Sequence, residues 1–253
     1  MQKLKPLYVG QVFSTTKCGN VEVIHIKDRR KITVRFLDTE STMTTTFDNL
    51  TCGEIRDIMR PSLYGVGIVG TWDRVGKDRE YDLWHSMLRR CYGVKELTRN
   101  PAYIGCSVSE DFKEYLKFKT WCNDQIGFSY SDTNSKHFHL DKDLLVKGNK
   151  VYSPDTCCFI PCEINALFTH IKKNKGAFPV GVNFCKASKK FRARVHRYGR
   201  RHDLGLFSTV EEASLAYKEA KETYIKEVAE KWKDQIDPRV YEVLMKYEVE
   251  ITD

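Results

Sequence analysis

Several features that define other classes of protein are missing from this sequence of 253 residues. It has no apolar run long enough to span a membrane, and its start, Met-Gln-Lys-Leu-Lys-Pro, has no apolar signal core. Its nine cysteines form no C-x-x-C pair, which argues against zinc knuckles and a disulfide framework. These absences predict a cytoplasmic protein with free thiols, no structural zinc and no membrane contact.

Acidic residues are absent from Ile171 to His202, a segment that contains eleven of the 42 Lys and Arg residues. The formal net charge of the chain is +8, so without these eleven cations the remainder would stand at −3. A cation run without counter-charge repels itself unless a polyanion relieves it. We therefore expect one segment to bind a polyanion and the rest of the chain to be globular, in two or three small domains.

Residues 1–66 are predicted to form a small β-barrel-like module. Four runs rich in Val, Ile, Thr and Phe are separated by turn formers. The runs are Tyr8–Phe13, Val21–Ile26, Ile32–Leu37 and Met43–Phe47. Such a barrel is too small for a catalytic cavity, so its role is expected to be packing or DNA contact.

Two helices are expected next. The first has apolar residues at three- and four-residue spacing, and the second begins after the N-cap candidate Ser109 and is predicted to bury an aromatic-rich face. The first set is Leu83, Trp84, Met87, Leu88 and Cys91; the second is Phe112, Tyr115 and Leu116.

A strand–turn–strand–helix (ββα) pattern follows, with strands at His139–Val146 and Val151–Tyr152 and a helix opened by Pro161. Strand alternation would place His137, His139, Asp141 and Asp143 on one face and Lys142 on the other. Asn165 lies early in the helix. A strand carboxylate and a helix amide at this spacing could converge on a hard divalent ion that grips a scissile phosphate.

Residues of this region resemble the HNH endonucleases of bacteriophages, many of which are homing enzymes. The resemblance rests on Trp84–Tyr92, Phe112–Trp121, Leu140–Asp143, Tyr152–Cys157 and Ile164–Ala166. It implies a nuclease domain over residues 67–172 that uses Mg²⁺, or alternatively Mn²⁺. By position, it implies metal ligands at Asp141 and Asn165, Lys142 in place of the general-base His, and Thr156 in place of the Asn that orients this base. His139 or His137 could activate water instead of Lys142.

The basic segment is predicted to form three short strands followed by a long helix. In the middle strand, Phe191, Ala193 and Val195 alternate with cations and His196. The helix begins with a capping box, Ser208-Thr209-Val210-Glu211, and has an apolar stripe that must cover the Phe-Ala-Val face. The opposite face, with Lys190, Arg192, Arg194 and His196, is then left open and suits the major groove.

This segment also resembles the APETALA/ethylene-response-factor (ERF) DNA-binding domain, in which a three-stranded sheet reads the major groove. The matching residues are Gly181-Val182, Phe191–His196, Leu204–Phe207, Glu211–Ala213 and Ala216-Tyr217. The resemblance implies an ERF-like domain over residues 173–236, with 237–253 as a tail. By position the DNA-facing residues would be Asn183, Cys185, Lys190, Arg192, Arg194, His196, Arg201 and Asp203. We also expect Arg197 to contact DNA. Asp203 stands where the plant domains often carry Trp.

Together these features predict an α+β chain in three parts: a small β-barrel, a helical plus ββα-metal unit, and a three-stranded antiparallel sheet on one long helix. The expected function is a monomeric, metal-dependent endonuclease that nicks or cleaves double-stranded DNA without a small-molecule cofactor. One alternative is a sequence-specific DNA-binding or regulatory protein whose nuclease unit has decayed, as Lys142 and Thr156 permit. RNA binding through the same basic face is a further alternative.

Overall fold

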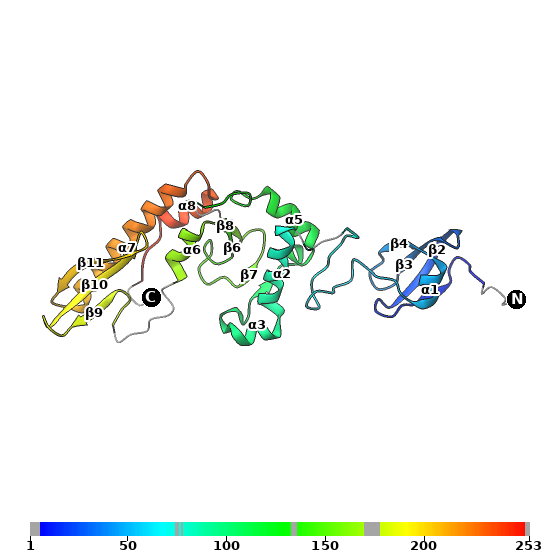
Figure 1. The fold of residues 1–253 in the computed structure, drawn as a ribbon, viewed down its shortest axis with the longest axis horizontal. Helices are drawn as coiled ribbons and strands as arrows, with labels where there is room; N and C mark the ends of the chain where they lie inside the picture. The colour runs from blue at the N-terminus through cyan, green and yellow to red at the C-terminus, as the bar shows by residue number, and fades with distance from the viewer. Residues whose placement is uncertain (1–5, 74–75, 77, 133–135, 170–177, 251–253) are drawn as a thin grey trace. The chain divides into compact units, whose positions relative to one another are not determined.

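The computed structural model describes residues 6–73, 76, 78–132, 136–169 and 178–250 of a mixed α and β protein (Figure 1). The chain divides into two compact units, Met1–Lys119 and Thr120–Asp253. This division does not coincide with the boundaries expected at residues 66 and 172, and the three-part division stays a prediction. Among the described helices, none is both long and apolar enough to cross a membrane.

The first unit begins with an antiparallel sheet whose four strands neighbour one another in chain order. These are β1 (Val12–Ser14), β2 (Asn20–Asp28), β3 (Lys31–Phe36) and β4 (Thr42–Thr45), followed by α1 (Phe47–Cys52). Val21, Val23, Ile32 and Val34 are fully buried and pack with Leu50. Within the described residues β1 pairs with β2 and β4 with β3, so the sheet keeps two edges and the predicted barrel is wrong. Four strands are too few for this sheet to curl round a core and pair its edges.

Helices dominate the rest of the first unit. The elements are α2 (Arg79–Tyr92), α3 (Val94–Arg99), the 3₁₀ helix η1 (Pro101–Tyr103), β5 (Ser107–Val108), α4 (Glu110–Lys113) and α5 (Tyr115–Asp124), which runs past the unit boundary. As its spacing predicts, α2 buries Trp84, Met87, Leu88 and Cys91. The indole Nε1 of Trp84 donates to the carbonyl oxygen of Phe112 at 2.7 Å, which satisfies a buried donor.

The single helix expected after Ser109 is instead two. Glu114 has an extended backbone between α4 and α5. The residues on either side of Glu114 bond to the backbone of Ile68. The Ile68 N–H donates to the Lys113 carbonyl, and the Tyr115 N–H donates to the Ile68 carbonyl, both at 2.9 Å. The break changes the helical phase, and Leu116, predicted to be buried, is 43% exposed.

The second unit contains the ββα pattern with a different pairing from the one predicted. Its elements are β6 (His139–Asp141), β7 (Val151–Tyr152), β8 (Cys158–Ile160) and α6 (Cys162–Thr169). The strand that pairs with β6 is β8, not β7. β6 ends at Asp141 because its Oδ1 accepts the backbone N–H groups of Asp143 at 3.0 Å and Leu144 at 2.8 Å, which turns the chain. Asp143 therefore does not share the strand face.

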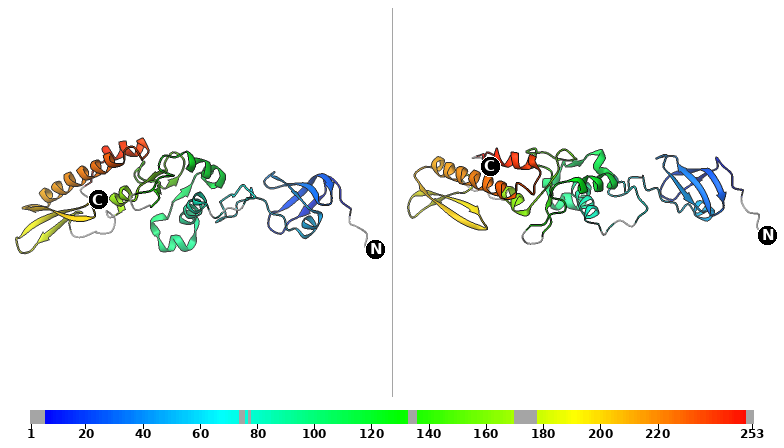
Figure 2. Two further views of the ribbon diagram at one scale, coloured as in Figure 1. Left: turned by 45° about the horizontal axis from the view of Figure 1, so that its top comes forward. Right: turned by 90° about the horizontal axis from the view of Figure 1, so that it is seen from above.

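The C-terminal part has the predicted three-stranded antiparallel sheet and long helix. The strands, in the order β11-β10-β9, are β9 (Val182–Cys185), β10 (Lys190–Arg197) and β11 (Arg200–Phe207); α7 (Val210–Trp232) and α8 (Pro238–Met245) follow. α7 packs along one face of this sheet, where Val182 and Ala193 are buried with Ala213 (Figures 1 and 2). Gly181 has φ +82° and lies so close to Tyr217 that an added Cβ would be 2.2 Å from its Cδ2.

Two details of this part differ from expectation. The capping box of α7 uses Thr209 and Glu212, one residue later than predicted, because Thr209 is the residue with the extended N-cap backbone. The expected tail, residues 237–253, contains α8, which buries Val240 and Leu244.

Candidate functional site

The β6–β8 strand pair and α6 bring two predicted site residues into contact. Nδ1 of His139 lies 3.1 Å from Nδ2 of Asn165. Asp141 lies on the same side of β6 as His139, because the two residues are opposite Cys158 and Ile160 in register. The sequence pattern predicted that a strand carboxylate and the Asn165 amide converge, whereas the contact found is between His139 and Asn165, and the strand that pairs with β6 is β8.

The Asn165 side chain can serve only one of two roles at a time. If Nδ2 donates to Nδ1 of His139, the amide oxygen is available to a cation, and His139 carries its proton on Nε2. If the amide is turned, its oxygen accepts from Nδ1–H, and Nε2 is then able to accept a proton from water. The predicted metal-ligand role of Asn165 and the predicted base role of His139 thus compete for one amide.

Asp141 is the carboxylate best placed to hold a cation. Burial raises the pKa of its carboxyl above the usual range, and the nearby Asp143 adds to this, while the two backbone donors to Oδ1 oppose it. Within the described residues Oδ2 accepts no hydrogen bond. A buried carboxylate of this kind favours a bound cation, which would relieve the cost of burying its charge.

Lys142 is buried and belongs to the loop after β6. Its Nζ donates to the Asn149 carbonyl at 3.2 Å, lies 3.3 Å from Oδ2 of Asp143 and sits 5.7 Å from the centre of the Tyr152 ring. The Asn149 amide closes the same loop by donating to the carbonyls of Lys142 at 2.6 Å and Val151 at 2.7 Å. These contacts give Lys142 a structural part; its predicted catalytic role remains a prediction.

The other predicted catalytic residues, Thr156 and His137, make contacts of their own. Thr156 Oγ1 donates to the Val151 carbonyl at 2.8 Å and lies 2.9 Å from Ser153 Oγ, which fixes the turn before β8. His137 is exposed, with Nδ1 3.2 Å from Ser131 Oγ. His170, which follows α6 in the sequence and could also be a ligand by residue type, falls outside the described residues.

The donor set near β6 suits a hydrated hard cation. In the described part of the chain, no group of three or more His, Cys, Asp or Glu residues could hold a metal. Mg²⁺ needs fewer protein ligands than such a group provides, since it keeps several waters and commonly takes only one or two carboxylates from a protein. The predicted ligands Asp141 and Asn165 are oxygen donors of the kind that Mg²⁺ takes, whereas a zinc site would need more nitrogen or sulfur ligands.

The β9–β11 sheet carries the second candidate site. Ala193 and Val195 face α7 and are buried, so the alternate residues of β10 face away from the helix, as predicted. Cross-strand register adds residues of β9 and β11 to this open face. The face contains Asn183, Cys185, Lys190, Arg192, Arg194, His196, Arg201 and Asp203.

Arg197, a predicted DNA contact, does not share the open face. It lies opposite Arg200 on the side of β10 that also carries Val195. The hairpin there is held to α7, because the Tyr198 N–H donates to the Tyr224 hydroxyl at 3.1 Å. Three lysines of the cation run, Lys172, Lys173 and Lys175, lie outside the described residues.

Within residues 120–253, α7 connects the β9–β11 sheet to α6, the helix that carries Asn165. Glu163 Oε2 on α6 accepts hydrogen bonds from Lys231 Nζ at 2.5 Å and Trp232 Nε1 at 2.8 Å. Lys221, 7% exposed, donates from Nζ to the Leu167 carbonyl at 2.9 Å, and its burial lowers its pKa to about 8. Sequence reasoning missed this connection, although the helical spacing could have found it, because Lys221 lies four residues after Tyr217 and three before Tyr224 on the apolar stripe.

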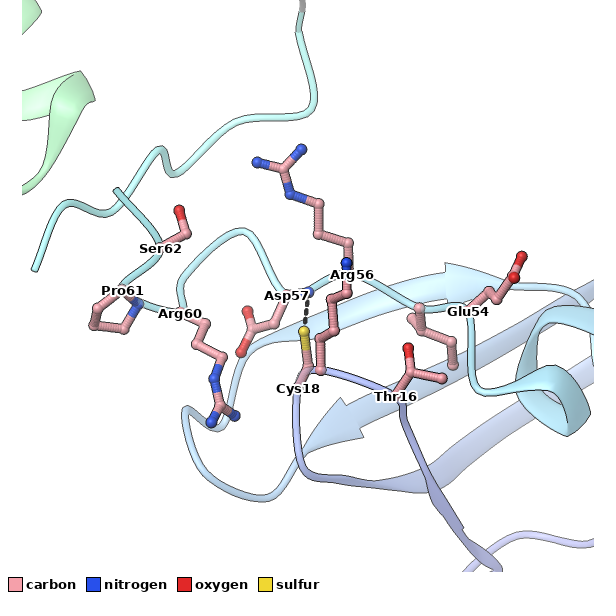
Figure 3. A pocket seen from close by; sticks show the side chains of 10 residues that line it. Thr16, Cys18, Glu54, Arg56, Asp57, Arg60, Pro61 and Ser62 are labelled. Atoms are coloured by element: carbon pink, nitrogen blue, oxygen red, sulfur yellow. Dashed lines mark hydrogen bonds between the residues drawn. The ribbon is translucent and has the colours of Figure 1, made fainter. Parts of the chain in front are cut away.

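The first unit has a pocket of about 710 Å³ at the edge of its sheet (Figure 3). Arg56 and Arg60 line it together with the buried Asp57, whose backbone N–H donates to Cys18 Sγ at 3.3 Å. Arg60 is paired with Asp38 at 2.9 Å. Because charges of both signs line the pocket, its lining favours no single class of ligand.

The two candidate sites offer complementary chemistry. One imidazole, one carboxylate and one amide can hold a hydrated cation and move a proton, while a cationic sheet can contact phosphates and base edges. Comparisons with protein-family models, with curated proteins and with solved structures found no match to this chain.

Proposed function

We propose that the chain is a divalent-metal-dependent endonuclease of duplex DNA, targeted by its basic sheet. The observation that carries the proposal is the 3.1 Å contact of His139 with Asn165, with Asp141 on the same side of β6. Asp141 and Asn165 would hold Mg²⁺ or Mn²⁺. When bound, such a cation would supply electrostatic stabilisation to the scissile phosphate and the leaving oxygen.

The role of His139 in this proposal depends on the Asn165 amide. With the amide oxygen directed at a cation, His139 presents Nε2–H as a hydrogen-bond donor to the substrate. With the amide turned, Nε2 accepts the proton of the attacking water. The two roles are chemically distinct, because only the second removes the proton of the attacking water.

DNA recognition is assigned to the open face of the sheet. Lys190, Arg201 and Asn183 suit phosphate contacts that set position, and Arg192 and Arg194 suit base edges in the major groove. α7 holds this face in the same compact unit as β6, β8 and α6, so cleavage should occur at a fixed offset from the recognised sequence.

A plasmid-nicking assay tests the proposal. Wild type should nick supercoiled DNA with Mg²⁺ or Mn²⁺ and not with a chelator. His139→Ala, Asp141→Ala and Asn165→Ala should each reduce nicking strongly. If nicking persists unchanged in Asp141→Ala and Asn165→Ala, the metal-site assignment is wrong.

A second candidate is a DNA-binding protein that does not cleave. It is favoured by Lys142, which stands where the resemblance places the general base and has its Nζ bonded to the Asn149 carbonyl. This candidate predicts salt-sensitive duplex binding and no nicking at any metal concentration.

A further inference from the structure

Asp203 is an acidic residue on the proposed DNA-reading face. It lies opposite Arg194 in the β10–β11 register. Its Oδ2 is 3.5 Å from Arg192 Nε and 3.6 Å from Arg194 Nε, and its Oδ1 accepts the Gly205 N–H at 3.0 Å. One anchored carboxylate therefore faces both arginines.

The contact at Nε matters because it leaves the ends of the guanidinium groups for other partners. Arg192 also donates from Nη2 to Cys185 Sγ at 3.8 Å, a weak and replaceable contact. Asp203 makes no hydrogen bond to Arg192 Nε, but its charge beside both Nε atoms favours one orientation of each guanidinium, and a side chain with fewer populated rotamers loses less freedom when its terminal nitrogens bind a planar acceptor pair. Each arginine side chain is only 32% exposed, so both are already partly ordered before any ligand binds.

A carboxylate on a DNA-binding face also has a cost. It repels phosphates, and so weakens the sequence-independent part of the affinity. An exposed ion pair contributes little to stability, and an asparagine oxygen could accept the Gly205 N–H as well, so fold stability does not explain a negative charge at this position. Orientation of the arginines, together with repulsion of DNA that does not match them, explains it better.

We propose that Asp203 is a positioning residue that sets Arg192 and Arg194 for base readout and disfavours non-target DNA. This inference rests on the proposed DNA binding of the sheet. It concerns specificity rather than cleavage, so it holds whether or not the site formed by His139, Asp141 and Asn165 is active.

The test uses the full chain and a duplex pool with a randomised core. Wild type first selects its preferred sequence from the pool. Fluorescence anisotropy then gives Kd for that duplex and for a scrambled duplex of equal composition. Asp203→Asn keeps an oxygen for the Gly205 N–H. It should bind the scrambled duplex about threefold more tightly and the selected duplex about threefold more weakly, so the specificity ratio should fall about tenfold.

Two further variants separate positioning from charge and from folding. Asp234→Asn makes the same charge change at an exposed site after α7 and should leave the ratio unchanged. Asp203→Glu keeps the charge and should restore most of the ratio lost in Asp203→Asn. An Asp203→Asn ratio within about twofold of wild type would overturn the positioning role while leaving DNA binding intact. If wild type binds no duplex from the pool, the proposed DNA binding fails and the inference fails with it.

Discussion

Replacing Lys221 with Met should change how stability depends on pH. The Lys221 side chain is buried where α7 meets α6, and its Nζ donates to the Leu167 carbonyl. Burial lowers its pKa from 10.5 to about 8. The folded protein therefore releases this proton near pH 8, whereas the unfolded chain keeps it until about pH 10.5.

The sign and size of the effect follow from proton linkage. Between these two pKa values the unfolded state binds more protons, so the free energy of unfolding of wild type should rise with pH relative to Lys221→Met. The gap between the pKa values corresponds to about 3 kcal/mol across the window. Below about pH 7 the difference between the two proteins should be constant.

Urea unfolding of the full chain at several pH values measures this difference. A reducing agent is needed because the nine cysteines are free. Lys226→Met, at an exposed position of the same helix, is the matched control, and its difference from wild type should stay flat. A flat difference for Lys221→Met would refute the burial of Lys221 and with it the packing of α7 on α6.

Two further predictions concern the sheet. Arg192→Ala or Arg194→Ala should weaken binding to the selected duplex by about 1–3 kcal/mol, measured by anisotropy, while Arg197→Ala on the opposite side should have little effect. Equal losses from all three would mean that charge alone, and not the open face, determines binding. Gly181→Ala should destabilise the second unit by about 1–3 kcal/mol in thermal melts, because residue 181 has φ +82° and the added Cβ would clash with the Tyr217 ring. Gly148→Ala, at φ +80° with no neighbour within 4 Å, should cost less; similar losses would contradict the steric reason.

Periodic patterns predicted the regular parts of the fold well. The alternation of Phe191, Ala193 and Val195 identified the helix-facing side of β10, and the spacing of Trp84 to Cys91 identified the buried side of α2. Both patterns extend over several turns or residue pairs, so tertiary context does not alter them. The same reasoning located Asn165 on the helix after Pro161, whereas its contact with His139 was not predicted.

Other features depended on single side-chain contacts and could not be predicted from a pattern. The end of β6 is set by two hydrogen bonds to Asp141 Oδ1, and the break before α5 by the pairing of Ile68 with the residues around Glu114. The positions of Lys142 and Lys221 depend on which carbonyl each ammonium reaches. The acid-free segment ends at His202, one residue before Asp203, so its charge pattern did not show the carboxylate that partly neutralises the predicted reading face.

The central claim is that Asp141 holds a cation required for DNA cleavage. It is tested most directly by nicking of supercoiled plasmid in Mg²⁺ by wild type and Asp141→Asn, with duplex binding measured in parallel. Asp155→Asn, a matched change in the exposed turn before β8, is the control. The account predicts that Asp141→Asn binds DNA as wild type does but loses nicking, while Asp155→Asn keeps both. Unchanged nicking by Asp141→Asn, or no nicking by wild type, would contradict the claim.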